Sequence, residues 1–287
     1  MAEQPPDTDA LPAPVAVRPG EHACCRFARL ADRRRVAVGL LRAGLDQRHR
    51  LLYLCDTGDA AGVGAALAAA DPAIAAALAR DQLGVRASAE VYAPDGDVDV
   101  EGVLGSILGE RDRAIQDGNE GLTITGEIGD AFCAAGGAAL EEYERRLDAL
   151  QIDHASLLCQ YDPAHFSPGQ LARVGRCHDV DLAPELAGIG REGCLAAGRL
   201  PTGVLRVTGK LDFDSAPALE GALDAHEPGE RRFDLDDVSY VDMAGMRALR
   251  GRTRQPLTIT SASPTVRRFL ELLAWDTDPL VTLAEIG

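Results

Sequence analysis

One histidine and two cysteines, His22, Cys24 and Cys25, fall within four residues near the start of the chain. Imidazole and thiolate groups bind zinc, but a structural zinc site needs four ligands, usually as two close pairs. Cys177 and His178 form the nearest comparable pair, and adjacent residues are poorly spaced to chelate one ion. We therefore predict that His22, Cys24 and Cys25 line a ligand pocket and that no metal is bound.

Three carboxylates follow apolar segments in the same half of the chain. Asp56 ends the segment 50–56, and Glu127 and Asp130 follow the Leu-Thr-Ile-Thr segment at 122–125. In parallel α/β sheets the carboxyl ends of the strands line ligand crevices. We therefore predict that Asp56, Glu127 and Asp130 contribute to the ligand site. A pair of carboxylates could also act in general acid–base catalysis or bind a metal ion. The alternative is that these residues lie in a solvated loop and have no functional role.

The sequence disfavours nucleotide hydrolysis. A phosphate loop needs Gly-x-x-x-x-Gly-Lys-Ser/Thr, because backbone amides surround the phosphates and the lysine neutralises charge. The segment 57–67, which follows the first strong apolar strand, has three glycines but no lysine. The chain's one Gly-Lys pair, Gly209-Lys210, precedes Leu211. We therefore predict no catalytic residues and no cofactor.

A turn near the end of the chain carries an unexpected residue. In "VSYVDMAGMRAL", residues 238–249, an apolar strand ends at Asp242, and Met246 and Leu249 follow with helical spacing. Helix starts favour small polar or acidic side chains, which satisfy free backbone N–H groups. A thioether, Met243, stands there instead.

Strand-like and helix-like segments alternate along both halves of the chain. The pattern predicts an α/β protein, with a mostly parallel sheet and flanking helices first and a small α/β sandwich after it. The acidic, Pro-rich residues 1–16 are predicted to form a disordered tail. We place the first domain at 17–190, a Gly-rich linker at 191–202 and the second domain at 203–287.

Composition narrows the classes of partner. The net charge of −16 argues against nucleic acid and against anionic membrane surfaces. The sequence lacks an apolar run of eighteen residues and a signal peptide pattern. Its seven cysteines lack the spacing of a disulfide framework, which predicts reduced thiols in the cytoplasm.

The C-terminal segments "GKLDFDSAPAL", "FDLDDVSYVDMAGMRAL" and "LTITSASPTVRRFLELL" resemble, in this order, the STAS domain of anti-sigma factor antagonists. In that family the turn reads Asp-Ser-x-Gly, and a kinase-type anti-sigma factor phosphorylates the serine to control binding. Here the turn reads Asp242-Met243-Ala244-Gly245, and a thioether cannot accept a phosphoryl group. The resemblance implies a partner surface at Asp212 and at the turn, facing an anti-sigma factor or a similar regulator. The alternative is a degenerate scaffold whose turn binds nothing.

The N-terminal half resembles the MEDS sensory domain over about residues 17–187. The resemblance rests on "GEHACCRFARLADRRRVAVGLLRAGLDQRHRLLYLCD", "GEIGDAF", "LEEYERRLDAL" and "LLCQYDPAHFSPGQLARVGRCHDV". His22-Ala23-Cys24 matches the early His-x-Cys of the family, while Cys25 and Arg26 replace more apolar residues. The resemblance implies a RecA-like fold that senses small organic molecules.

These patterns together predict a cytoplasmic bacterial signalling protein that is not an enzyme. Its first domain would sense a small molecule or a partner, and its second would bind a regulator without serine phosphorylation. Two other hypotheses stay open: a RecA-like hydrolase that uses Glu127 or Asp130, and a redox or metal sensor that uses Cys24 and Cys25. The sequence also leaves open whether the chain forms homo-oligomers.

Overall fold

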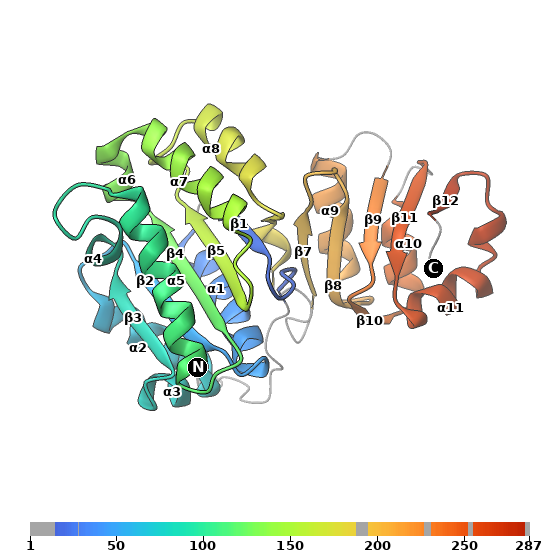
Figure 1. Ribbon diagram of the computed structural model, residues 1–287. Coiled ribbons are helices and arrows are strands. Elements are labelled where there is room, and N and C mark those ends of the chain that lie inside the picture. Colours follow the sequence, from blue (N-terminus) through green and yellow to red (C-terminus); the bar gives the residue numbers. More distant parts are fainter. Residues whose placement is uncertain (1–14, 28, 188–194, 227–230, 252–254, 285–287) are drawn as a thin grey trace, which may run out of the picture.

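The computed structural model describes residues 15–27, 29–187, 195–226, 231–251 and 255–284. These residues form one mixed, mostly parallel sheet with flanking helices, so the chain is an α/β protein (Figure 1). The strands are β1 (His22–Arg26), β2 (Arg50–Cys55), β3 (Leu83–Ala87), β4 (Leu122–Ile128), β5 (Ala155–Tyr161), β6 (Val180–Leu182), β7 (Leu195–Arg199), β8 (Leu205–Leu211), β9 (Arg231–Leu235), β10 (Val238–Val241), β11 (Leu257–Ala262) and β12 (Val281–Leu283). The helices are α1 (Leu30–Asp46), α2 (Ala60–Ala70), α3 (Pro72–Ala79), α4 (Ala89–Tyr92), α5 (Val100–Gln116), α6 (Asp130–Ala135), α7 (Gly137–Leu150), α8 (Pro168–Val174), α9 (Ala216–His226), α10 (Met243–Arg250) and α11 (Pro264–Leu272), with short 3₁₀ turns η1 (Gly175–Cys177), η2 (Pro184–Leu186) and η3 (Trp275–Thr277). No helix among the described residues is long and apolar enough to cross a membrane.

The sheet runs without a break from one half of the chain into the other. Its order is β12-β11-β9-β8-β7-β6-β1-β5-β4-β2-β3, and β10 also pairs with β8. Of the described strands, only β7 runs antiparallel to its neighbours; the other pairs are parallel, as the alternating pattern predicts. The β6–β7 pair joins the two halves.

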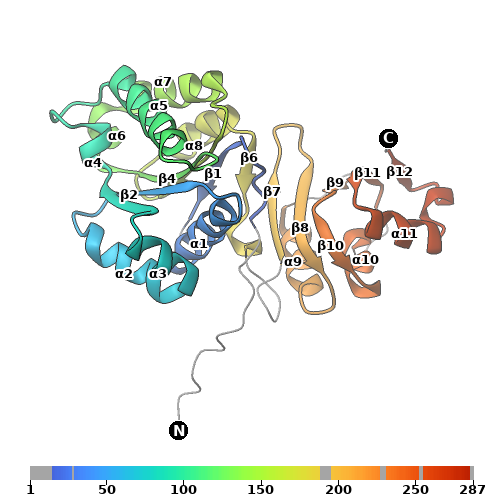
Figure 2. The same cartoon turned by 60° about the horizontal axis from the view of Figure 1, so that its bottom comes forward.

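Helices cover both faces of the sheet in the N-terminal half (Figure 2). Helices α1, α2 and α3 pack on one face, where Val36 and Leu40 of α1 join the buried side chains of the strands. Helices α5, α7 and α8 pack on the other face through side chains such as Ile107 and Leu147. The stripe predicted by the spacing of Leu140, Tyr143 and Leu147 is buried in α7, whereas Leu150, the next residue of that stripe, is 40% exposed.

The predicted linker at 191–202 is partly wrong. Residues 191–194 lie outside the described part of the chain, but Leu195–Arg199 form β7 and pair with β6 and β8. A Cβ atom on Gly198 would lie 2.5 Å from Cγ2 of Val180, so this glycine permits close packing of neighbouring strands. The glycines that suggested a loop therefore include one that a strand requires.

Two further boundaries differ from the predictions. Residues 1–14 of the predicted tail lie outside the described residues, but Ala16 is buried in a cluster with Val36 and Leu40. The apolar pattern of "RRFDLDDVSYVD" predicts one strand over 231–242. The structure divides this segment into β9 and β10, because the Asp234 carboxylate accepts the Asp236 N–H at 3.1 Å and closes a turn.

Candidate functional site

The Asp242 carboxylate fixes the turn between β10 and α10. Its Oδ1 accepts the backbone N–H groups of Ala244 at 2.8 Å and Gly245 at 2.9 Å, which caps the helix. Its Oδ2 accepts the N–H of Phe213 at 3.0 Å. Asp242 therefore supplies the capping group from one position earlier than Met243. The thioether is left free of any capping role.

Large apolar side chains are exposed around this turn. Met243 is 42% exposed, Tyr240 at the end of β10 is 49% exposed, and Phe213 in the loop after β8 is 74% exposed. The Phe213 backbone is held to the turn through Asp242. Gly245 allows α10 to begin against β8, since a Cβ there would lie 2.1 Å from the Leu211 carbonyl oxygen. The turn is thus rigidly built yet presents apolar groups to solvent.

Asp212, the other predicted partner-binding residue, has a local structural role. Its Oδ1 accepts the backbone N–H groups of Asp214 and Ser215, both at 3.1 Å. These bonds close the turn that leads into α9, and the Ser215 hydroxyl in turn accepts the Asp212 N–H at 2.9 Å. The loop that carries Phe213 is therefore also fixed in place.

The structure brings Asp56, Glu127 and Asp130 together at the carboxyl ends of β2 and β4. The Asp130 N–H donates to the Asp56 carboxylate at 3.2 Å, and the Asp56 N–H donates to Glu127 Oε2 at 3.2 Å. Arg33 Nη1 and the Tyr53 hydroxyl donate to Glu127, each at 2.7 Å. Burial, followed by the Glu127 charge, raises the pKa of Tyr53, so this hydroxyl stays protonated and donates. The buried Glu127 carboxylate holds the strand ends together and has little capacity left for a ligand.

The other predicted ligand residues do not lie in one pocket. Alternation along β1 places Cys24 in the core beneath α5 and α7, and places Cys25 against Val36 and Leu40 of α1 on the opposite face. His22 pairs with Leu157 near the start of β5. The prediction of a single crevice that includes the strand ends and the His22–Cys25 segment is therefore wrong.

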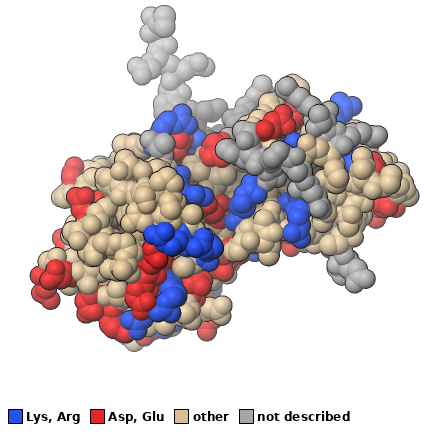
Figure 3. Space-filling model, turned by 90° about the horizontal axis from the view of Figure 1, so that it is seen from above, with Lys and Arg blue, Asp and Glu red and all other residues tan. Residues whose placement is uncertain are grey.

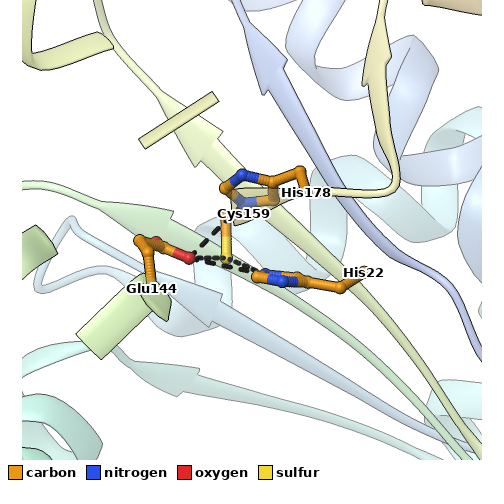
Figure 4. Close-up of side chains that lie close together, drawn as sticks. All are labelled: His22, Glu144, Cys159 and His178. Atoms are coloured by element: carbon orange, nitrogen blue, oxygen red, sulfur yellow. Dashed lines mark hydrogen bonds and ion pairs between the residues drawn. The ribbon is translucent and has the colours of Figure 1, made fainter. Parts of the chain in front are cut away.

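His22 instead meets three side chains from other segments, and we call these four residues the buried cluster (Figure 4). Glu144 comes from α7, Cys159 from β5, and His178 from the segment before β6. All four are at least 96% buried, and their ligand atoms lie within 4.8 Å of one another. Sequence spacing gives no sign of this cluster, since its consecutive members are 122, 15 and 19 positions apart along the chain.

The distances within the buried cluster are short. Glu144 Oε2 lies 3.4 Å from Nε2 of His22 and 3.4 Å from Nε2 of His178. Cys159 Sγ lies 3.3 Å from His22 Nε2 and 3.7 Å from Glu144 Oε2. The two imidazole rings stack obliquely, with centroids 4.1 Å apart. Two nitrogen atoms, one sulfur and one oxygen thus converge on a small volume.

The protonation of the buried cluster follows from its burial and its charges. Burial, together with the nearby His178, lowers the pKa of His22 to about 3, so this ring is neutral. Burial, together with Glu144, raises the pKa of the Cys159 thiol to about 12. Burial alone would raise the pKa of Glu144, but His178 lowers it below its ordinary value. The cluster therefore contains a carboxylate whose charge depends on the adjacent imidazole.

A cavity of about 610 Å³ borders the buried cluster at the amino-terminal ends of β1 and β5. His22 lines both the cavity and the cluster, and the wall also includes Leu147, Asp148, His154 and Asp179. The Asp179 carboxylate accepts the backbone N–H of His22 at 2.8 Å. This cavity is therefore at the opposite edge of the sheet from Asp56, Glu127 and Asp130.

One feature of the sequence could have indicated Glu144. Leu140, Tyr143 and Leu147 form the buried stripe of α7, and residue 144 lies four positions after 140 and three before 147. A carboxylate in the middle of an apolar stripe needs a buried partner. The identity of the partners depends on the tertiary fold.

Each half of the chain matches a model of a known protein family. Residues 21–179 match the family model "MEDS: MEthanogen/methylotroph, DcmR Sensory domain", and residues 196–282 match the model "Mlab, STAS domain". None of the curated proteins compared with the chain matches it. The crystal structure of the flagellar accessory protein FlaH from Methanocaldococcus jannaschii is similar over 64% of this chain and 79% of that one, with 11% identity and a TM-score of 0.39.

The two domain types indicate a role in signalling or regulation, and the STAS domain indicates interaction with a protein regulator. The MEDS match extends over more than half of the chain and includes His22, Glu144, Cys159 and His178. The chain belongs to the MEDS family, and a STAS domain follows its MEDS domain.

Proposed function

We propose that this chain is a non-catalytic signalling protein whose STAS domain binds an anti-sigma factor or a similar regulator through the Asp242–Gly245 turn. Binding would not depend on serine phosphorylation, because Met243 occupies the position of the phosphoacceptor. The MEDS domain would supply the sensory input. The exposed apolar group formed by Met243, Tyr240 and Phe213 is the observation that carries this proposal.

The construction of the turn supports a docking role. Exposure of large apolar side chains to water is unfavourable in free energy for a monomer. Groups of such side chains on a rigid backbone are typical of protein interfaces. Both loops are fixed by the three hydrogen bonds that Asp242 accepts. A partner would therefore meet a preformed surface and lose little entropy in ordering it.

The charge of the surface also supports a protein partner rather than nucleic acid. On the face shown in Figure 3, acidic and basic side chains lie side by side over the N-terminal half. Many arginines of the N-terminal half form ion pairs, such as Arg48 with Glu120 and Arg146 with Glu142. Paired arginines are poor phosphate contacts, because their donors are already in use.

The input to the MEDS domain has a candidate location. The cavity of about 610 Å³ beside His22 has the size of a small-molecule site, and its wall mixes apolar and polar side chains. We propose that a small organic ligand binds there, at the edge of the sheet nearest to the buried cluster. Isothermal titration of candidate ligands against the wild-type chain and a Leu147→Trp variant, which narrows the cavity, would test this location.

The docking proposal is tested with two substitutions at one position. Met243→Ser restores a hydroxyl at the start of α10, and Met243→Asp places a permanent charge there. Binding to a panel of purified kinase-type anti-sigma factors would be measured for both variants, along with phosphate incorporation. Leu272→Asp is the control, because Leu272 is a similarly exposed apolar residue on α11.

We expect Met243→Asp to weaken binding by about tenfold or more, because desolvating an unpaired carboxylate costs at least about 1.4 kcal/mol. Leu272→Asp should bind as the wild type does. Wild-type protein should incorporate no phosphate at this turn. Undiminished binding of the Met243→Asp variant would instead support the degenerate scaffold.

A further inference from the structure

We propose that His22, Glu144, Cys159 and His178 bind one divalent transition-metal ion, and that Zn²⁺ is the ion that best suits their donor atoms. This site is separate from the STAS surface, so it goes beyond the function proposed above. It also replaces the expectation from the sequence that no metal is bound.

The spacing of the donor atoms matches a tetrahedral ion. Zinc bonds of 2.0 to 2.3 Å place neighbouring ligand atoms of a tetrahedron about 3.3 to 3.6 Å apart. Four of the six distances between the donor atoms of the buried cluster are 3.3 Å, 3.4 Å, 3.4 Å and 3.7 Å, and all six are within 4.8 Å. Two imidazole nitrogens, a thiolate and a carboxylate oxygen are all ligands that zinc accepts.

The buried cluster can stay electrically neutral when it binds a dication. Glu144 is fully buried, and among the described residues its ion-pair partners are the histidines His22 and His178. Burial alone would lower the pKa of His178, but Cys24 and Glu144 raise it well above its ordinary value, so a protonated His178 compensates the carboxylate in the absence of an ion. When Zn²⁺ binds, the Cys159 thiol and the His178 ring each lose a proton to solvent. The thiolate, the Glu144 carboxylate and two neutral imidazoles then carry two negative charges, which the ion neutralises.

Hydrogen bonds outside the cluster orient its ligands. His178 Nδ1 donates to the Val174 carbonyl oxygen at 2.8 Å, so the lone pair of the neutral ring lies on Nε2, which faces Glu144. The Tyr161 hydroxyl donates to Glu144 Oε1 and leaves Oε2 for the ion. A backbone carbonyl behind a ligating histidine is a common feature of metal sites, because it fixes the tautomer and the ring.

The ion has a route from solvent. His22 is the residue shared by the buried cluster and the cavity of about 610 Å³, and Asp148 and Asp179 line the same cavity. These carboxylates would attract a cation to the wall that His22 forms. Once bound, the ion would join β1, β5, α7 and the segment that leads into β6.

The first test uses the purified full-length chain, stripped of metal with a chelator and titrated with Zn²⁺ or Co²⁺ alone. We expect a metal content of one zinc ion per chain, as measured by elemental mass spectrometry. The cobalt form should show the visible bands of a tetrahedral site and a thiolate-to-cobalt charge-transfer band. X-ray absorption of the wild-type zinc form should give one sulfur and three nitrogen or oxygen neighbours, which requires no variant.

Two substitutions identify the ligands. Cys159→Ser should abolish the charge-transfer band. It should also weaken zinc binding by more than about 100-fold, because loss of a residue that merely supports a metal ligand already weakens binding by up to about that factor. Glu144→Gln should also weaken binding. The matched control is Cys25→Ser, which removes a buried thiol from the adjacent strand on the opposite face of the sheet and should keep both stoichiometry and spectrum.

Three results would overturn the assignment: no zinc bound at equimolar concentration, a zinc shell with no sulfur or with two, or undiminished binding by Cys159→Ser. A two-sulfur shell would place Cys24, which lies next to His178, among the ligands instead. None of these results bears on the Met243 experiment, so the two proposals fail independently.

Discussion

Arg206 Nη1 in the STAS domain donates a hydrogen bond of 2.7 Å to Oε2 of Glu21, which precedes the first strand of the MEDS domain. Arg206 also donates from Nε to the buried Asp234 carboxylate at 3.3 Å. Arg18 forms ion pairs with Asp234 and Asp237 at 3.0 Å and 2.9 Å. The two domains are thus joined by ion pairs, in which Arg206 and Asp234 are buried, as well as by the β6–β7 strand pair.

Replacing Arg206 with methionine should destabilise the chain by about 1 to 3 kcal/mol, because Glu21 loses its charged partner and the buried Asp234 carboxylate keeps only Arg18 of its two arginines. Urea unfolding monitored by circular dichroism measures the change. Arg232→Met is the control on the neighbouring strand, since Arg232 is exposed and donates to the Thr202 carbonyl oxygen at 3.1 Å rather than to a buried carboxylate. A loss no larger than that of the control would show that the charged contacts contribute little.

Two glycines in helices of the STAS domain should respond in opposite directions to alanine. Gly245→Ala places a methyl group 2.1 Å from the Leu211 carbonyl oxygen and should cost about 1 to 3 kcal/mol by overpacking. Gly221 in α9 has open space around the same position, so Gly221→Ala should stabilise by up to about 1 kcal/mol. Thermal unfolding of both variants measures whether each substitution raises or lowers the stability of the chain. Equal effects of the two substitutions would contradict the close approach of α10 to β8.

Thiol labelling should separate the cysteines by burial. Cys133 is exposed, whereas burial and the neighbouring Cys24 raise the pKa of Cys25 well above 9.0. With Cys194, which lies outside the described residues, replaced by serine, iodoacetamide at pH 8 should modify Cys133 first and leave Cys25 unmodified until the chain unfolds. Peptide mass spectrometry locates the label. Partial burial and Asp130 raise the pKa of Cys133 as well, so its rate should increase with pH.

The Glu110 carboxylate should make stability depend on pH in the acid range. Burial alone would raise the pKa of Glu110, but Arg113 at 2.8 Å and Arg86 at 2.7 Å lower it below 4.5. A depressed pKa in the folded state stabilises the fold above pH 4.5 and loses this effect as pH falls through the folded-state pKa. Wild type should therefore be more stable than Glu110→Gln at pH 6 to 7, and the difference should shrink below pH 4.5.

Glu142→Gln is the control for this dependence, because Glu142 is partly exposed and pairs with Arg145 on the same helix. Exposed pairs contribute little to the free energy of unfolding. Chemical unfolding between pH 3 and 7 compares the two variants with the wild type. If the difference in unfolding free energy between the wild type and Glu110→Gln stayed constant down to pH 3, this result would contradict the depressed pKa of Glu110.

Much of the architecture follows from local sequence. Ser263 followed by Pro264 predicts the start of the last long helix, and the Ser263 hydroxyl accepts the Val266 N–H at 3.4 Å. The spacing of Leu140, Tyr143 and Leu147 predicts a helix, and α7 buries these three side chains because apolar periodicity decides which face of a helix is buried. The sequence patterns of both domains were likewise sufficient to identify the MEDS and STAS families in the right order.

Other features depend on contacts between distant segments. Gly198 suggested a loop because glycine is common in loops, but its small size is needed where β7 packs beside Val180 of β6. The continuity of the sheet from one domain to the other depends on this strand. Local periodicity could not show it, since β7 spans five residues and two of them, Ala196 and Ala197, are small apolar residues that fit several structures.

The sequence alone determined which residues carry reactive groups: a histidine and two cysteines near the start, and a turn without a hydroxyl. Only the tertiary structure decided their neighbours. Strand alternation sends Cys24 and Cys25 to opposite faces, while the packing of α7 on the sheet brings Glu144 to His22, Cys159 and His178. Spacing along a chain specifies the face of one element, whereas a site built from four elements requires the packing that brings those faces together.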